Sequence, residues 1–248
     1  MGVVLAACGP GLAVAQVATE QVDGGEDGST GYPVVFVERP LTLPARMAQV
    51  SISGARWWIE EEDDVSITSV GAVVGLTDRW QVSSSTRWRL APEREWREIV
   101  GVGSRVLAVD TARFDLAPGL SVPILFDGDR DTGAVPAVTL DAIARIRAVR
   151  RIALYLGDDL ATVGFTGDGS ASIDLNATLV TQLNDHLALR ISAEVLHIRL
   201  HGDGRESGGP YWLAWMAVAS PASWIDLWLG IQLQSESDAA IGGVTGRL

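Results

Sequence analysis

The histidines are the residues of this chain best suited to acid–base or metal chemistry, and two of them are close in sequence. His197 and His201 are four residues apart, with Arg199 between them, whereas His186 lies in a polar turn. Alternate residues of a strand share a face, so on a strand all three of the first group point the same way. Two imidazoles beside a guanidinium can bind an anion or a metal ion, but a polar strand end has the same pattern. We therefore predict no metal site and no cofactor here.

An acidic stretch at residues 127–133 is similar to a calcium-binding loop. Asp127, Asp129 and Asp131 occupy its first, third and fifth positions. Its glycine falls one place late, and the twelfth position holds Val138 instead of the glutamate that gives such a loop its bidentate ligand. The pattern favours a solvated acidic loop over a calcium site.

The elements that position these residues are predicted to be β-strands. Apolar and polar residues alternate through residues 171–183, and nearly as cleanly through residues 80–90, 120–126 and 225–233. Period-two alternation over such lengths indicates a strand with two different faces. Weaker segments of the same kind are residues 47–59, 66–76, 98–109, 138–148, 151–165, 187–200, 209–219 and 239–248. Together they predict twelve strands.

Two of these strands change phase midway, near residues 158–159 and 195–196, and a β-bulge would absorb each change. Two other segments also fit a helix by periodicity or hydropathy. They are residues 139–152 and residues 211–233, and for each the strand interpretation is the one we favour.

The connections are of two kinds that alternate along the chain. Short polar turns lie near Asp78, Thr111, Arg150, Asp185 and Pro221, and two of them share a pattern, LTDRWQV and LNDHLAL. Longer acidic or glycine-rich loops lie between them. Short turns at one end, long loops at the other and an even number of strands are typical of an up-and-down antiparallel barrel that spans the outer membrane.

By these turns, the strand lengths and an apolar leader, residues 47–248 resemble a bacterial outer-membrane β-barrel protein, of porin-like type but of no specific family. The chain departs from such barrels in ending on VTGRL without a terminal aromatic residue. The resemblance implies location in the outer membrane of a Gram-negative bacterium. Its implied partners are lipid, lipopolysaccharide and the barrel-assembly machinery. Barrel lipases and deacylases place His and Ser two residues apart; that pattern does not occur here, so we predict no catalysis.

The first 46 residues are predicted to lie outside the barrel. Residues 1–15 are apolar and end in Ala-Val-Ala, a signal-peptidase pattern, although LAAC at residues 5–8 leaves lipidation of Cys8 open. No positive residue precedes the apolar run, so the true start is also open. Residues 16–46 begin acidic and glycine-rich, and we predict a mobile segment.

The polar faces of the strands are predicted to line a wet lumen. Their charged residues are Arg87, Arg89, Arg105, Asp141, Arg145, Arg147, Asp174, Arg190, Glu194 and Asp226. Charges projecting into a narrow interior can sort small ions. Six arginines against four acids predict a weak preference for anions if the lumen is open.

Tryptophans at strand ends are predicted to form an interfacial girdle in place of scarce tyrosine. They are Trp57, Trp58, Trp80, Trp88, Trp96, Trp212 and Trp224. An ordinary protein core is the other interpretation of these residues.

Three functions remain open at this point. The formal net charge of −12 argues against nucleic acid as a partner, because no basic stripe exists to displace counterions. The leading prediction is a passive channel for small solutes or ions. The alternatives are a non-conducting envelope or adhesion scaffold that uses acidic extracellular loops, and a secreted soluble β-barrel that binds a small ligand.

Overall fold

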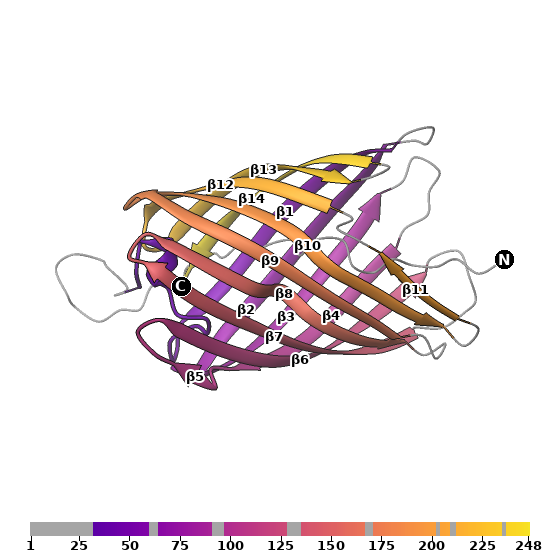
Figure 1. Ribbon diagram of the computed structural model, residues 1–248, viewed down its shortest axis with the longest axis horizontal. Helices are drawn as coiled ribbons and strands as arrows, with labels where there is room; N and C mark the ends of the chain where they lie inside the picture. The colour runs from indigo at the N-terminus through magenta and orange to yellow at the C-terminus, as the bar shows by residue number, and fades with distance from the viewer. Residues whose placement is uncertain are drawn as a thin grey trace.

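The described part of the chain is one antiparallel β-sheet closed into a barrel (Figure 1). The computed structural model describes residues 32–59, 64–90, 97–127, 135–166, 171–201, 204–208, 212–234 and 237–248. The expected leader, residues 16–31 and most of the calcium-like loop lie outside these ranges. The prediction of an all-β barrel with twelve strands is confirmed.

Every strand of the barrel runs antiparallel to its two neighbours. The twelve are β1 (Ala48–Ile59), β2 (Val65–Thr77), β3 (Trp80–Leu90), β4 (Arg97–Val106), β6 (Phe114–Asp127), β7 (Val135–Val149), β8 (Ile152–Thr166), β9 (Ala171–Asn184), β10 (Leu187–His201), β12 (Trp212–Ala222), β13 (Ile225–Gln234) and β14 (Ser237–Arg247). The last strand returns to the first, in register from Gln49 opposite Arg247 to Ile59 opposite Ser237. Closure gives each of these strands a hydrogen-bonding partner on both sides, which a strand in hydrocarbon requires.

Three short elements are not among these twelve strands. They are the 3₁₀ turn η1 (Phe36–Glu38), β5 (Val109–Asp110) and β11 (Gly204–Gly208). The strand expected at residues 98–109 is wrong at its end: β4 stops at Val106, and β5 pairs separately with β6. The short turn predicted near Thr111 is the turn between β5 and β6, where the Thr111 amide donates to the Phe114 carbonyl at 3.0 Å.

Both ambiguous segments are strands. Residues 139–152 fall largely within β7, and residues 212–233 form the hairpin of β12 and β13. Among the residues that the structure describes, no helix has the length and apolar character needed to cross a bilayer.

Two bulges fall where the alternation changes phase. The register against β9 shifts between Leu156 and Ala161 of β8, and between Glu194 and Leu196 of β10. Relative to β9, the irregularity adds three residues to β8 and one residue to β10. An odd number of extra residues reverses which side chains face inward beyond that point. As a result Glu194 and His197, which are three residues apart, both lie on the inner side of β10.

The two faces of the wall have opposite character. Along β13, Leu227, Leu229 and Ile231 are exposed on the outside, Leu229 by 70%, whereas Asp226 and Gln232 are buried inside. A protein folded in water has the reverse arrangement. An apolar outer face over a polar interior is the arrangement expected of a wall in contact with hydrocarbon.

Residues 32–46, which belong to the segment 16–46 predicted to be mobile, pack against the barrel. These residues, called here the inner segment, fold into the short-turn end of the barrel near the C-terminus (Figure 1). Val37 and Arg39 within it are 2% and 6% exposed. The composition that suggested mobility belongs to residues 16–31, whereas the inner segment has aromatic, aliphatic and arginine side chains that the barrel buries.

A charge placed on the outer face tests whether that face contacts lipid. We expect Leu229→Arg, near the middle of β13, to destabilise the barrel by about 2–4 kcal/mol in lipid vesicles. The same change at Leu76, beside the last residue of β2, should cost only about 0–1 kcal/mol because it lies near the interface. Urea unfolding in vesicles measures both. Equal, small effects at the two positions would contradict a lipid-facing wall.

Candidate functional site

The inner segment crosses the short-turn mouth of the barrel and bonds to several strands. The Phe36 amide donates to Oε1 of Gln182 on β9 at 2.9 Å, and the Leu43 amide donates to Oε1 of Gln81 on β3 at 2.8 Å. The Ala45 amide donates to Oδ1 of Asp78, in the turn after β2, at 3.0 Å. These three acceptors come from separate parts of the wall, so the segment spans the mouth instead of following one strand.

A buried ion cluster around Arg39 fixes the middle of the inner segment. Arg39 donates through Nη1 and Nη2 to the two carboxylate oxygens of Asp226, at 2.6 and 2.8 Å. Ser220 Oγ donates to Asp226 at 2.6 Å, and Arg247 also donates to this carboxylate. Bidentate arginine–carboxylate pairs combine charge with fixed geometry. Asp226 therefore fixes the position of the inner segment and also neutralises the charge of Arg39.

A second cluster holds the same segment from another side of the wall. Arg145 on β7 donates to the backbone oxygens of Val37 and Arg39. Its Nε also donates to Asp115 Oδ2 at 2.7 Å, and Arg147 Nη2 donates to that oxygen at 2.8 Å. The side chain of Arg39 and its own carbonyl thus bond to β13 and β7 respectively, which are well separated around the barrel.

Aromatic rings of the inner segment stack on the arginines of the wall. The guanidinium of Arg247 lies 4.6 Å from the ring centre of Tyr32, and that of Arg190 lies 5.5 Å from the ring centre of Phe36. Arg39 itself lies 5.0 Å from the Phe36 ring. Cation–π contacts of this kind strengthen when they are removed from water. They add to the attachment that the ion clusters provide.

One glycine allows the segment to approach the wall closely. A Cβ added at Gly75 on β2 would lie 1.9 Å from the backbone oxygen of Pro44 and 2.6 Å from that of Leu43. No side chain fits at such distances. The chain therefore enters the barrel over a position where only glycine is tolerated.

A polar cavity of about 400 Å³ lies between the inner segment and the wall. Its charged lining consists of Arg39, Arg105, Arg145, Arg190, Arg247, Asp141 and Asp226. Serines of β3 and β4 complete one side. Because five of these seven side chains are cationic, the cavity attracts anions more than cations.

The structure brings half of the predicted lumen charges together at this cavity. Those that line it are Arg105, Asp141, Arg145, Arg190 and Asp226. Arg105 Nη2 on β4 and Asp141 Oδ1 on β7 form an ion pair at 3.1 Å on the inner face of the wall. Whether these side chains act on a passing ion stays a prediction.

The other predicted lumen charges lie elsewhere. Arg147 joins the Asp115 cluster, and Arg87 is half-buried on β3. Asp174 and Glu194 are buried inside the barrel in a separate group. The side chain of Arg89 lies outside the described residues.

Sequence reasoning missed Arg39, Asp115 and Arg247. Arg39 lies in the segment expected to be mobile, and Asp115 precedes the range expected for its strand. For Arg247 the signal was present, because it alternates with Thr245 on the polar face of β14.

The tryptophans of the predicted girdle lie on both faces of the wall. Trp58, Trp80 and Trp224 are exposed on the outside. Trp57 packs against the inner apolar cluster and Trp212 is 7% exposed on the inner face, so these two do not face the surroundings. Successive side chains of a strand point to opposite faces of the sheet, so at a strand end only every second residue can contact the membrane interface. Trp88 is half-buried, and Trp96 lies outside the described residues.

Comparison with solved structures agrees with this geometry. The KdgM porin in complex with disordered oligogalacturonate matches at 10% identity with a TM-score of 0.54, over 78% of this chain and 96% of that chain. The NanC porin matches at 9% identity with a TM-score of 0.59, over 80% of this chain and all of that chain. The fold is that of outer-membrane porins. No family model and no curated protein matches the sequence.

Removing the arginine of the inner segment should release that segment from the barrel. We expect Arg39→Gln to speed hydrogen exchange of residues 32–46, since it removes both hydrogen bonds from the segment to Asp226, and a hydrogen bond to a charged group contributes about 1.5–3 kcal/mol. Arg247 still neutralises Asp226, so the barrel itself should stay folded. Hydrogen exchange followed by mass spectrometry measures the change.

The matched control is Arg46→Gln, in the same segment but exposed. It should leave exchange of residues 32–46 unchanged. Unchanged exchange in Arg39→Gln would show that the ion cluster does not hold the segment.

Proposed function

We propose that this protein is a passive channel of the outer membrane for small anionic solutes, narrowed at its short-turn mouth by the inner segment. The observation that carries the proposal is the arginine-rich cavity enclosed by a wall that is apolar outside. Such a wall suits a bilayer, and an enclosed polar interior suits passage of hydrated solutes. In the orientation usual for these barrels, the short-turn mouth faces the periplasm.

The arrangement of charges supports selection of anions despite the acidic net charge of the whole chain. Arg190 and Arg105 extend the positive lining beyond the two clusters that hold the inner segment. Arg105 pairs with Asp141, which lowers its effect on a passing ion, and Arg190 contacts the ring of Phe36. In a narrow bore, the electric field of opposed charges selects ions in addition to the selection by pore diameter.

The solutes that fit this chemistry carry carboxylate or similar groups. The KdgM porin was solved with oligogalacturonate, whose units bear carboxylates. For this chain we propose only the same broad class of solute, a small anion, because arginine binds planar oxyanions with two parallel hydrogen bonds. A divalent cation held by the acidic loops could join the barrel to lipopolysaccharide.

A closed structural barrel is the second candidate, and one observation favours it. The inner segment is held on several sides by buried hydrogen bonds and ion pairs, so it can block conduction altogether. In that case the loops predicted to be acidic and extracellular would be the functional surface.

Single-channel recording in planar bilayers separates the two candidates. We expect purified wild-type protein to give discrete current steps with a reversal potential that favours anions in a salt gradient. Arg190→Gln and Arg105→Gln should each reduce anion selectivity, because each removes a positive charge from the cavity. Arg56→Gln is the control, since Arg56 lies on the outside with its side chain 63% exposed.

The Arg39→Gln protein completes this experiment. A silent wild type with a conducting Arg39→Gln variant would mean that the inner segment closes the bore. Absence of current steps in both proteins, or selectivity for cations in either, would contradict the proposed function.

A further inference from the structure

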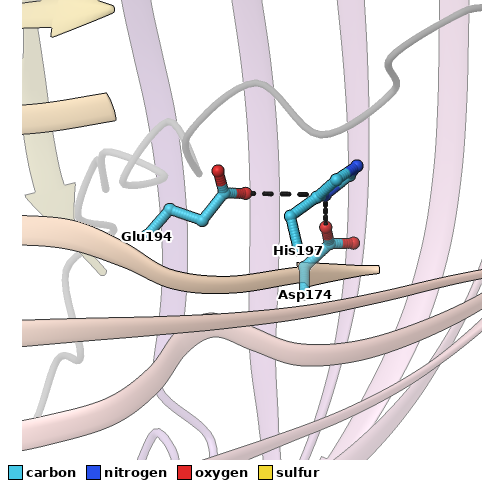
Figure 2. A group of neighbouring side chains, drawn as sticks. All are labelled: Asp174, Glu194 and His197. Carbon is cyan, nitrogen blue, oxygen red and sulfur yellow. Dashed lines mark hydrogen bonds and ion pairs between the residues drawn. The ribbon is translucent and has the colours of Figure 1, made fainter. Parts of the chain in front are cut away.

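A group of three potential metal ligands lies inside the barrel, apart from the inner segment. Asp174 extends from β9, and Glu194 and His197 extend from β10, so that the three side chains meet over the inner wall (Figure 2). Asp174 is near the start of β9 and His197 near the end of β10, which places them toward the long-loop end. The group is not part of the arginine-lined cavity.

The bulge in β10 creates this group. In a regular strand, residues three apart face opposite sides, so Glu194 and His197 could not meet. The register shift between Glu194 and Leu196 turns His197 inward, directly opposite Asp174 on β9. The bulge therefore positions two donors from one strand beside a third donor from its neighbour.

The geometry is close to that of a metal site. His197 Nδ1 bonds to Asp174 Oδ1 and lies 3.7 Å from Glu194 Oε1. One donor atom from each of the three residues lies within 4.8 Å of the others. Three ligands about 2 Å from one ion have this spacing after small rotations of their side chains.

The charges of the group favour a cation. The side chains of Asp174 and Glu194 are 3% and 4% exposed, so two acidic groups lie close together away from water. Ionised carboxylates buried away from water are costly unless they are paired or coordinate a metal. A divalent ion between them would neutralise both and leave the imidazole neutral as a ligand.

An independent observation at Asn176 points to the same ligand. Asn176 is 7% exposed and lies opposite Glu194 in the β9–β10 register, two residues from Asp174 on the same face. Its Oδ1 is buried and has no hydrogen-bond partner among the described residues. Such orphaned acceptors are uncommon, and a bound ion or water is one of their ordinary explanations.

We propose that Asp174, Glu194 and His197 form a binding site for a divalent transition-metal ion, with Zn²⁺ as its representative, and that Asn176 supplies a neighbouring oxygen. One imidazole nitrogen with carboxylate oxygens suits Zn²⁺ and similar ions. Ca²⁺ and Mg²⁺ favour sets made of oxygen alone. The proposal goes beyond the channel function and does not depend on conduction.

Calorimetric titration of the full folded chain in detergent tests the site, after treatment with a chelator. We expect wild-type protein to bind one Zn²⁺ per chain and to bind Ca²⁺ much more weakly. His197→Gln and Glu194→Gln should each weaken Zn²⁺ binding by roughly tenfold or more, since changes even around metal ligands have effects of this size. His186→Gln is the matched control, because His186 lies at the short-turn end and bonds to the Ser220 carbonyl.

Each variant is first shown to be folded by its heat-modifiable migration on a gel. If His197→Gln does not fold, Asp174→Asn takes its place with the same expected loss. Zn²⁺ binding that is equal in wild type and ligand variants, or lost equally in His186→Gln, would overturn the proposal. So would absence of Zn²⁺ binding by the folded wild type. Because no current is measured, this result is independent of the bilayer experiment.

Discussion

The requirement that every strand finds hydrogen-bond partners without help from water determines this structure. In hydrocarbon an unpaired backbone amide or carbonyl costs several kcal/mol, so a sheet must close on itself. Pairing of β1 with β14 along almost their whole length meets that requirement. Once the barrel is closed, successive side chains of each strand point alternately to the surroundings and to the interior. In this sequence the outward positions are mainly apolar.

The polar interior in turn explains the inner segment. Arginines and aspartates that face inward need partners, and the inner segment adds to those that the wall provides. Arg39 supplies a cation for Asp226, and the backbone of the same segment supplies acceptors for Arg145. A narrow bore with charges on several strands thus binds a piece of its own chain, and most of the charged side chains that line the remaining cavity are arginines.

The sequence predicted the fold well because closure and alternation leave a regular trace. The phase changes near residues 158 and 195 correctly marked the two register shifts. The inner segment could not be predicted in the same way. Its contacts join Phe36 to Gln182 and Arg39 to Asp226, and no local pattern encodes pairs so distant in the chain.

The metal-ligand group illustrates the same limit. Strict alternation placed His197 on one face with Arg199 and His201, and from that arrangement we predicted no metal site. The bulge was visible in the sequence, but its consequence, that His197 meets Glu194 and Asp174, depends on the register between β9 and β10. Likewise Trp57 and Trp212 were placed at the interface because of their position along a strand, whereas the face decides their surroundings.

Spin-label accessibility along β13 tests the central claim most directly. Single cysteines at residues 227–233, in a chain with Cys8 replaced by serine, carry nitroxide labels in lipid vesicles. We predict that oxygen, which concentrates in hydrocarbon, relaxes labels at Leu227, Leu229, Ile231 and Leu233 more than those between them, with the opposite phase for a water-soluble nickel complex. A lipid-facing wall would be contradicted if relaxation did not alternate along the strand, or if the nickel complex strongly relaxed the four outward positions. Either result would mean that lipid does not contact the outer face while water fills the interior.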